Sequence, residues 1–166
     1  MTLTPYYPVN PSMVFVTAAF HDTGVVEGRE RHHIVSGRIV RSDPKLKEWF
    51  DEEQIETIAE AVEDHRASSQ REPRSIYGKI VAEADRDIDK EKIVIRTIEY
   101  GQSHYPLLDK ESLWRRTLQH LHEKYAEDGY LKLWLPESPN RQRLEELRAL
   151  IADEKSLREI FDRETT

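Results

Sequence analysis

Residues 13–24 read MVFVTAAFHDTG, an almost wholly apolar run that ends abruptly at His21 and Asp22. A segment that is apolar on nearly every side is expected to lie in a core, as a helix. An imidazole and a carboxylate at its end would then be partly removed from water, which is unfavourable unless a partner compensates them. A divalent metal is such a partner, because neutral His and ionised Asp both bind transition metals. The alternative is a helix end whose His and Asp are hydrogen-bonded or solvated.

The composition limits the class of protein. The chain has 166 residues, a length that fits one domain with its own core. Its net charge of −7 disfavours a nucleic-acid polymer as partner. Because the chain has no cysteine, any metal must be bound by His, Asp, Glu and water. No apolar stretch approaches the roughly 20 residues of a membrane span, and the N-terminal residues do not resemble a signal peptide. We therefore expect a cytoplasmic protein without a membrane partner.

The periodicity is helical almost throughout and predicts an all-α fold. The first helix follows three prolines, with Asn10 or Ser12 as its N-cap. Further helices are expected at about 31–41, 51–66, 75–89, 110–126, 141–152 and 155–163. Ser42-Asp43-Pro44 indicates an N-cap with proline at the first helical position, opening a short helix to Phe50.

In two segments the sequence pattern suits either a strand or a helix. Residues 91–100 contain the β-branched run Ile93-Val94-Ile95, for which we favour a helix because no partner strand is evident. Residues 130–135 read YLKLWL, which suits a strand or a short extended or helical link.

Four predicted helices each place His or Asp beside apolar or small residues that are expected to face inward. His65, for example, follows Val62 by three residues and Ile58 by seven, so it shares their face. Taken singly, a hydrogen-bonded core His or a solvated Asp is the more common case. Their coincidence favours a metal centre of the kind that helical bundles build. The positions are His21-Asp22, His33, His65 and Asp85.

These motifs resemble the HD-domain superfamily of metal-dependent phosphohydrolases, which are all-helical proteins named for their His-Asp pair. The resemblance covers residues 11–89, through AAFHDTG at 18–24, His33 followed by Ser36-Gly37, AVEDHR at 61–66 and EADR at 83–86. The run that includes RSIYGKI at 74–80 also resembles a group of uncharacterised bacterial HD proteins. The resemblance implies an HD-like helical bundle forming a single domain over 1–166, with the metal-site core at about 11–89 and a C-terminal extension at about 90–166.

The resemblance also implies a set of ligands. These are His21, Asp22, His33, His65 and Asp85, with Asp22 able to bridge two ions. His32 is the alternative to His33, because the two are adjacent. A site of imidazole and carboxylate suits divalent Fe, Mn, Co, Ni or Mg.

The implied activity is hydrolysis of a phosphoester or phosphoanhydride bond in a nucleotide or another small molecule. In this interpretation Asp22 acts with the metal, and Asp64, Glu27 or Glu30 takes up a proton or orients water. Arg86 stabilises negative charge that develops on the phosphoryl group. Substrate-binding candidates flank the expected ligands, although solvation or ion pairing is the alternative for each; they are Arg66, Arg74 and Lys79. The helical tail after Asn140 suits a cap or a homodimer contact.

One element of the HD pattern has no counterpart in the sequence. HD proteins carry a first ligand His on a helix that precedes the His-Asp pair, whereas no His precedes His21 here. We therefore expect weaker metal binding and an exposed apolar groove where that helix packs. A second hypothesis follows, in which the chain is a catalytically inactive HD-fold module that binds a ligand or a protein.

Overall fold

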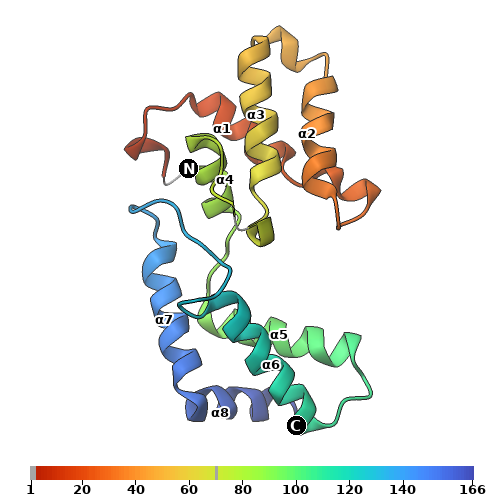
Figure 1. The fold of residues 1–166 in the computed structure, drawn as a ribbon, viewed down its shortest axis with the longest axis vertical. Helices are drawn as coiled ribbons and strands as arrows, with labels where there is room; N and C mark the ends of the chain where they lie inside the picture. Colours follow the sequence, from red (N-terminus) through yellow and green to blue (C-terminus); the bar gives the residue numbers. More distant parts are fainter. Residues whose placement is uncertain (1–2, 70) are drawn as a thin grey trace. The chain divides into compact units, whose positions relative to one another are not determined.

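The computed structural model describes residues 3–69 and 71–166. Within these residues the regular structure consists of α-helices and short 3-10 turns, with no strand, which confirms the all-α prediction. The chain divides into two compact units: an N-terminal unit of residues up to 86 together with 133–138, and a C-terminal unit of 87–132 and 139–166 (Figure 1). The expectation of one domain over the whole chain stays a prediction.

The N-terminal unit is built around helix α3 (Glu52–Asp64). Helix α2 (His32–Ser42) packs along α3, and helices α1 (Pro11–Phe20) and α4 (Ile76–Ala84) also contact it (Figure 1). Helix α3 begins with a capping box. The Asp51 side chain accepts from the backbone N–H of Gln54 at 2.8 Å, and the Gln54 side chain accepts from the backbone N–H of Asp51 at 3.1 Å. Its apolar positions recur every three or four residues, so they form one face, and Ile58, Ala59 and Val62 are fully buried.

The core of this unit joins α1, α2 and α3. Met13 and Val40 meet the buried face of α3, together with Leu46 and Phe50 from the segment between α2 and α3. A second cluster gathers Leu3, Val14, Ile80, Val81 and Leu135, so the segment 133–138 returns to the N-terminal unit. These two clusters hold the ends of α1 and α4 in place, where the candidate ligands lie.

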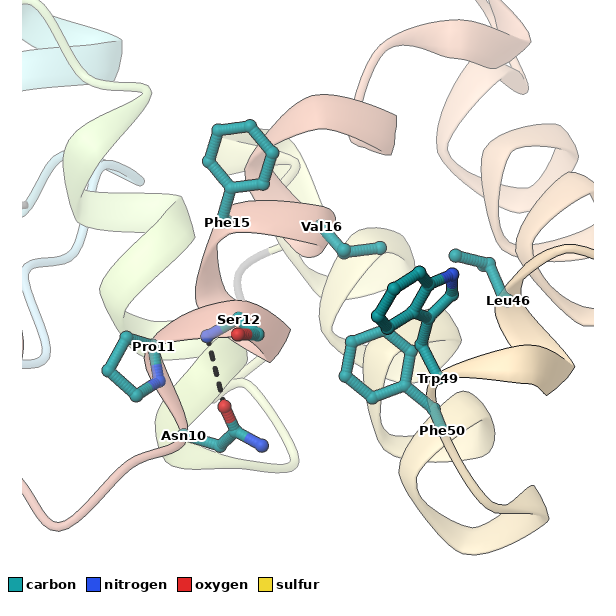
Figure 2. Close-up of a pocket in the computed structure, with 8 residues that line it drawn as sticks. All are labelled: Asn10, Pro11, Ser12, Phe15, Val16, Leu46, Trp49 and Phe50. Carbon is teal, nitrogen blue, oxygen red and sulfur yellow. Dashed lines mark hydrogen bonds between the residues drawn. The ribbon is translucent and has the colours of Figure 1, made fainter.

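The expectation that the run 13–20 is buried on nearly every side is wrong. Met13, Val14 and Thr17 are buried, but Phe15 is 65% exposed and Ala18 and Ala19 are also exposed. An apolar hollow of about 510 Å³ borders this helix (Figure 2). Besides Phe15 its walls include Trp49, which is 79% exposed. Helix α1 therefore packs on one side only.

Two other segments also differ from expectation. The predicted helix from Pro44 to Phe50 is only a 3-10 turn, Leu46–Glu48, and Ser42 ends α2 instead of capping a new helix. Asp43 does accept a hydrogen bond from the backbone of Lys45 at 2.9 Å, as an N-cap residue does, but the segment after it forms only this one 3-10 turn. Helix α4 ends at Ala84, five residues earlier than predicted.

The C-terminal unit contains helices α5 (Lys90–His104), α6 (Lys110–Tyr125), α7 (Asn140–Ala152) and α8 (Glu154–Glu164). Helix α5 confirms the helical choice for residues 91–100, and residues 130–135 form neither strand nor helix. Fully buried residues from all four of these helices make its core, among them Ile98, Leu121, Leu147 and Phe161. None of the helices in the described part of the chain has both the length and the apolar composition that crossing a bilayer requires.

Gly24 permits a close approach between the turn Thr23–Glu27 and the start of α2. Its backbone N–H donates to Ser36 Oγ at 2.8 Å. A Cβ at this position would strike the carbonyl oxygen of His32 and lie 2.6 Å from the backbone nitrogen of Ser36. Because helical backbone does not yield easily, Gly24→Ala should lower the free energy of unfolding by about 2–3 kcal/mol, measured by urea denaturation.

Gly28→Ala is the matched control. Gly28 has a φ of 105° but no atom within 4 Å of an added Cβ, so that change costs only backbone strain, about 1 kcal/mol. A Gly24→Ala variant no less stable than Gly28→Ala would contradict the close packing.

Candidate metal centre

The candidate ligands lie at helix ends that meet in the N-terminal unit. His21, His65 and Asp85 are the C-cap residues of α1, α3 and α4, and Asp22 follows His21 directly. His32 is the first residue of α2. The C-terminal end of a helix carries partial negative charge on its free carbonyl groups, so three such ends favour a cation.

Each of three histidines is fixed through its Nδ1 atom. Since a carbonyl oxygen only accepts, Nδ1–H must be the donor in all three contacts, which leaves Nε2 as the ring nitrogen facing outward. The acceptors lie three residues earlier in the chain: Ala18 for His21 at 2.7 Å, Arg29 for His32 at 2.7 Å and Val62 for His65 at 2.5 Å. Metal-binding histidines are typically oriented by a hydrogen bond of this kind from the second ring nitrogen.

The Nε2 atoms of two of these histidines converge on Asp22. His32 Nε2 lies 3.1 Å from His65 Nε2 and 3.1 Å from Asp22 Oδ1, and His65 Nε2 lies 3.5 Å from the same oxygen. These three residues form a group whose ligand atoms all lie within 4.8 Å of one another. The set contains two imidazoles and one carboxylate.

This donor set fits a divalent transition metal. A ring that binds a metal through Nε2 carries its hydrogen on Nδ1, so the two Nε2 atoms would present lone pairs to a cation between them. Donors about 2.1 Å from one ion lie roughly 3.0–3.4 Å apart, depending on the angle at the metal. Two of the observed separations, both 3.1 Å, lie within that range, and the third, 3.5 Å, is just above it. Asp22, His32 and His65 could therefore hold one ion.

His21 and Asp85 form a second pair beside this group. His21 Nε2 lies 3.3 Å from Asp85 Oδ1 and 3.8 Å from Asp22 Oδ2. The hydrogen bond with Asp85 raises the pKa of His21 to about 9, and the same bond lowers the pKa of Asp85. Without a metal, the pair is thus an imidazolium and a carboxylate. A divalent ion could take the place of the imidazolium proton, and the two oxygens of Asp22 face the two parts of the centre.

The centre is closed on the His65 side and open at Asp22. The side chain of His65 is 4% exposed, and burial lowers its pKa, which keeps the ring neutral as metal binding requires. The side chain of Asp22 is 53% exposed. A ligand would therefore approach from the carboxylate side.

The structure brings His32, and not His33, into this group. His33 Nδ1 is buried and makes no hydrogen bond, and burial, followed by the nearby Arg66, lowers the pKa of the ring. The His33 ring lies 5.6 Å from that of His32. The sequence pattern favoured His33 because it precedes Ser36 and Gly37, but a residue's helix face says nothing about the bond between His32 Nδ1 and Arg29.

Asp64 and Arg74 bond to each other. The backbone nitrogen of Arg74 donates to Asp64 Oδ2 at 2.7 Å, and its Nε donates to both carboxylate oxygens at 3.1 and 3.2 Å. Arg74 also pairs with Glu63, at 2.7 Å, and Glu63 in turn contacts Arg41 of α2. These ion pairs tie α2, α3 and the segment before α4 together, so Asp64 and Arg74 have a structural use.

The remaining predicted cations differ in their surroundings. Lys79 pairs with Glu72, and Arg66 donates to the backbone carbonyl of Glu30. Arg86 follows Asp85 directly and is partly buried, and this burial lowers the pKa of its guanidinium. Among the predicted cations, Arg66 and Arg86 each follow a residue of the centre directly, His65 and Asp85 respectively.

Replacing each of the two adjacent histidines separates the alternatives. His32→Gln should weaken Mn²⁺ or Co²⁺ binding at least about 100-fold, since even loss of an outer partner of a metal ligand costs about 10–100-fold. His33→Gln should change the affinity less than about threefold, measured by competition with a chelating dye. Equal losses in the two variants would contradict the geometry.

A family model described as HD domain matches residues 1–88, which is more than half of the 166 residues. No curated protein and no solved structure shows a significant match to the chain. The matched range contains every residue of the centre, from the His21-Asp22 pair to Asp85, and the all-helical fold agrees with it. The chain belongs to the HD-domain family.

Proposed function

We propose that this chain is a metal-dependent phosphohydrolase that acts on a nucleotide or another small phosphoester. The observation that carries the proposal is the common orientation of three histidines. Nδ1–H of each ring donates to a backbone carbonyl, so that Nε2 faces Asp22 or Asp85, where a cation would bind. The Nε2 atoms of His32 and His65 lie 3.1 Å apart while Nδ1–H of each ring is bonded elsewhere, so a cation or a proton is needed between them, and a divalent ion would satisfy both.

In this proposal Asp22, His32 and His65 hold one divalent ion, and His21, Asp85 and the second oxygen of Asp22 contribute to a neighbouring position. Without thiolates the donor set suits Fe, Mn, Co, Ni or Mg. When bound, such an ion activates water and polarises a phosphoryl oxygen. The protein's own part is to hold the donors in place through the backbone bonds and to leave the exposed side of Asp22 open to a substrate.

Cationic side chains are needed where negative charge develops on the phosphoryl group. Arg86 is the best-placed candidate, because it adjoins Asp85 and its burial places the charge in a medium of low polarity. Arg66 is a second candidate, whereas the ion pairs of Arg74 and Lys79 favour structural roles for them.

A catalytically inactive HD module that binds a ligand is the second candidate function. Its support is that only three described residues, Asp22, His32 and His65, form a compact group of possible ligands. A site with fewer protein donors binds its metal more weakly, so binding without turnover would fit this alternative.

The test is metal-dependent hydrolysis in Asp22→Asn. The wild-type protein should hydrolyse p-nitrophenyl phosphate or a nucleotide when supplied with Mn²⁺, Co²⁺ or Fe²⁺. The variant should lose at least about 100-fold in kcat/KM, because Asn offers a neutral oxygen in place of a charged metal ligand.

Asp43→Asn is the matched control, because Asp43 lies in an exposed turn of the same unit and its Oδ1 only accepts from a backbone N–H. This variant should keep the wild-type rate within about twofold. Metal binding without hydrolysis of any of these substrates would favour the inactive module. Hydrolysis that survives in Asp22→Asn would contradict the proposed centre.

A further inference from the structure

Arg116 on α6 lies against two tyrosine rings of the C-terminal unit. The carbon of its guanidinium is 4.7 Å from the centre of the Tyr105 ring and 5.2 Å from that of Tyr100. Its Nη1 would be 3.3 Å from a Cβ on Gly101, so glycine lets the guanidinium lie close to the backbone of α5. The His104 ring stacks on Tyr100 at 3.8 Å. The charge is thus held in a fixed position by aromatic surfaces.

No carboxylate among residues 3–69 and 71–166 pairs with this guanidinium, although the chain as a whole is acidic. The acidic residues nearest in the sequence of α6 are already bonded: Asp109 caps the helix, and Glu111 pairs with Arg158 at 3.1 Å. Nη1 is buried and makes no hydrogen bond. A charge in such surroundings interacts strongly with an anion that reaches it, because little solvent screens it.

Exposed apolar side chains occur among the residues that contact this charge and in the loop that follows them. Tyr100 and Tyr105 are each nearly half exposed, and the loop that follows contributes Leu108 and Leu107, of which Leu107 is 97% exposed. Tyrosine and arginine are enriched among the residues that dominate binding energy at protein interfaces. A single small anion would leave these side chains uncovered, whereas a polypeptide would cover them.

We propose that Arg116, Tyr100, Tyr105 and Leu107 form a docking surface for an acidic segment of a partner protein. A carboxylate of the partner binds the Arg116 guanidinium, and apolar residues next to that carboxylate pack on the two tyrosines and Leu107. Charge complementarity selects this partner, since the surface offers one uncompensated cation within an aromatic and aliphatic rim. The surface belongs to the C-terminal unit and acts independently of the metal centre.

The test uses the full-length protein and two end-blocked peptides of leucine, alanine and either glutamate or glutamine. The glutamate peptide should shift the backbone amide NMR signals of residues 100–108 and 112–120, and the glutamine peptide should bind at least about tenfold more weakly. Arg116→Gln should weaken binding of the glutamate peptide about tenfold, and Arg116→Lys should weaken it less. Arg115→Gln, the adjacent exposed arginine, is the matched control and should change the affinity less than about twofold.

Several results would overturn the proposal. Equal binding of the two peptides, or equal effects of Arg115→Gln and Arg116→Gln, would show that Arg116 does not bind a carboxylate of the partner. Inorganic phosphate that produces the same signal shifts at the same concentration would show a simple anion site. A change of oligomeric state in Arg116→Gln would assign the surface to a second copy of this chain instead of a separate partner. The melting temperature of each variant shows whether the fold is retained.

Discussion

The hydrogen bond from histidine Nδ1 to a backbone carbonyl three residues earlier is the interaction on which the centre depends. It recurs at His21, His32 and His65, at distances of 2.5–2.7 Å. At the ends of α1 and α3 it satisfies carbonyl groups that the helix leaves without a partner. The same bond fixes the tautomer and direction of each ring. The same hydrogen bonds therefore cap these helix ends and orient the ligands. Whether the donor atoms converge then depends on where each helix ends.

The packing around α3 supplies that positional accuracy. The buried face of α3 contacts α1, α2 and α4, so the three elements that carry the other ligands are placed by one helix. Gly24 allows the turn after Asp22 to touch the first turn of α2, which sets His32 beside Asp22. The ion pairs of Arg41, Glu63 and Arg74 join the same elements on their outer side. Stability and function thus draw on the same contacts, and a loosened core would spread the donors apart.

The sequence predicted helices well where one face carries a long apolar period, as in α3, and α5 was recognised as a helix despite its β-branched residues. It was less accurate for short segments and for side-chain bonds. The helix expected from Pro44 to Phe50 is only a 3-10 turn, although Asp43 bonds to the backbone of Lys45 as a cap does. His32 was ranked below His33 because helical periodicity describes faces and does not include a bond to the carbonyl of Arg29. The bonds between Asp64 and Arg74 likewise depend on a loop conformation that no spacing rule describes.

Elemental analysis tests the central claim most directly. The protein would be purified without chelator and without a metal-affinity column, and its metal content measured against protein concentration. We predict near-stoichiometric iron, manganese or another divalent transition metal, because the Nε2 atoms of His32 and His65 and the carboxylate of Asp22 are arranged for a cation. Absence of metal, even after incubation with an excess of divalent ions and removal of unbound ions, would contradict it.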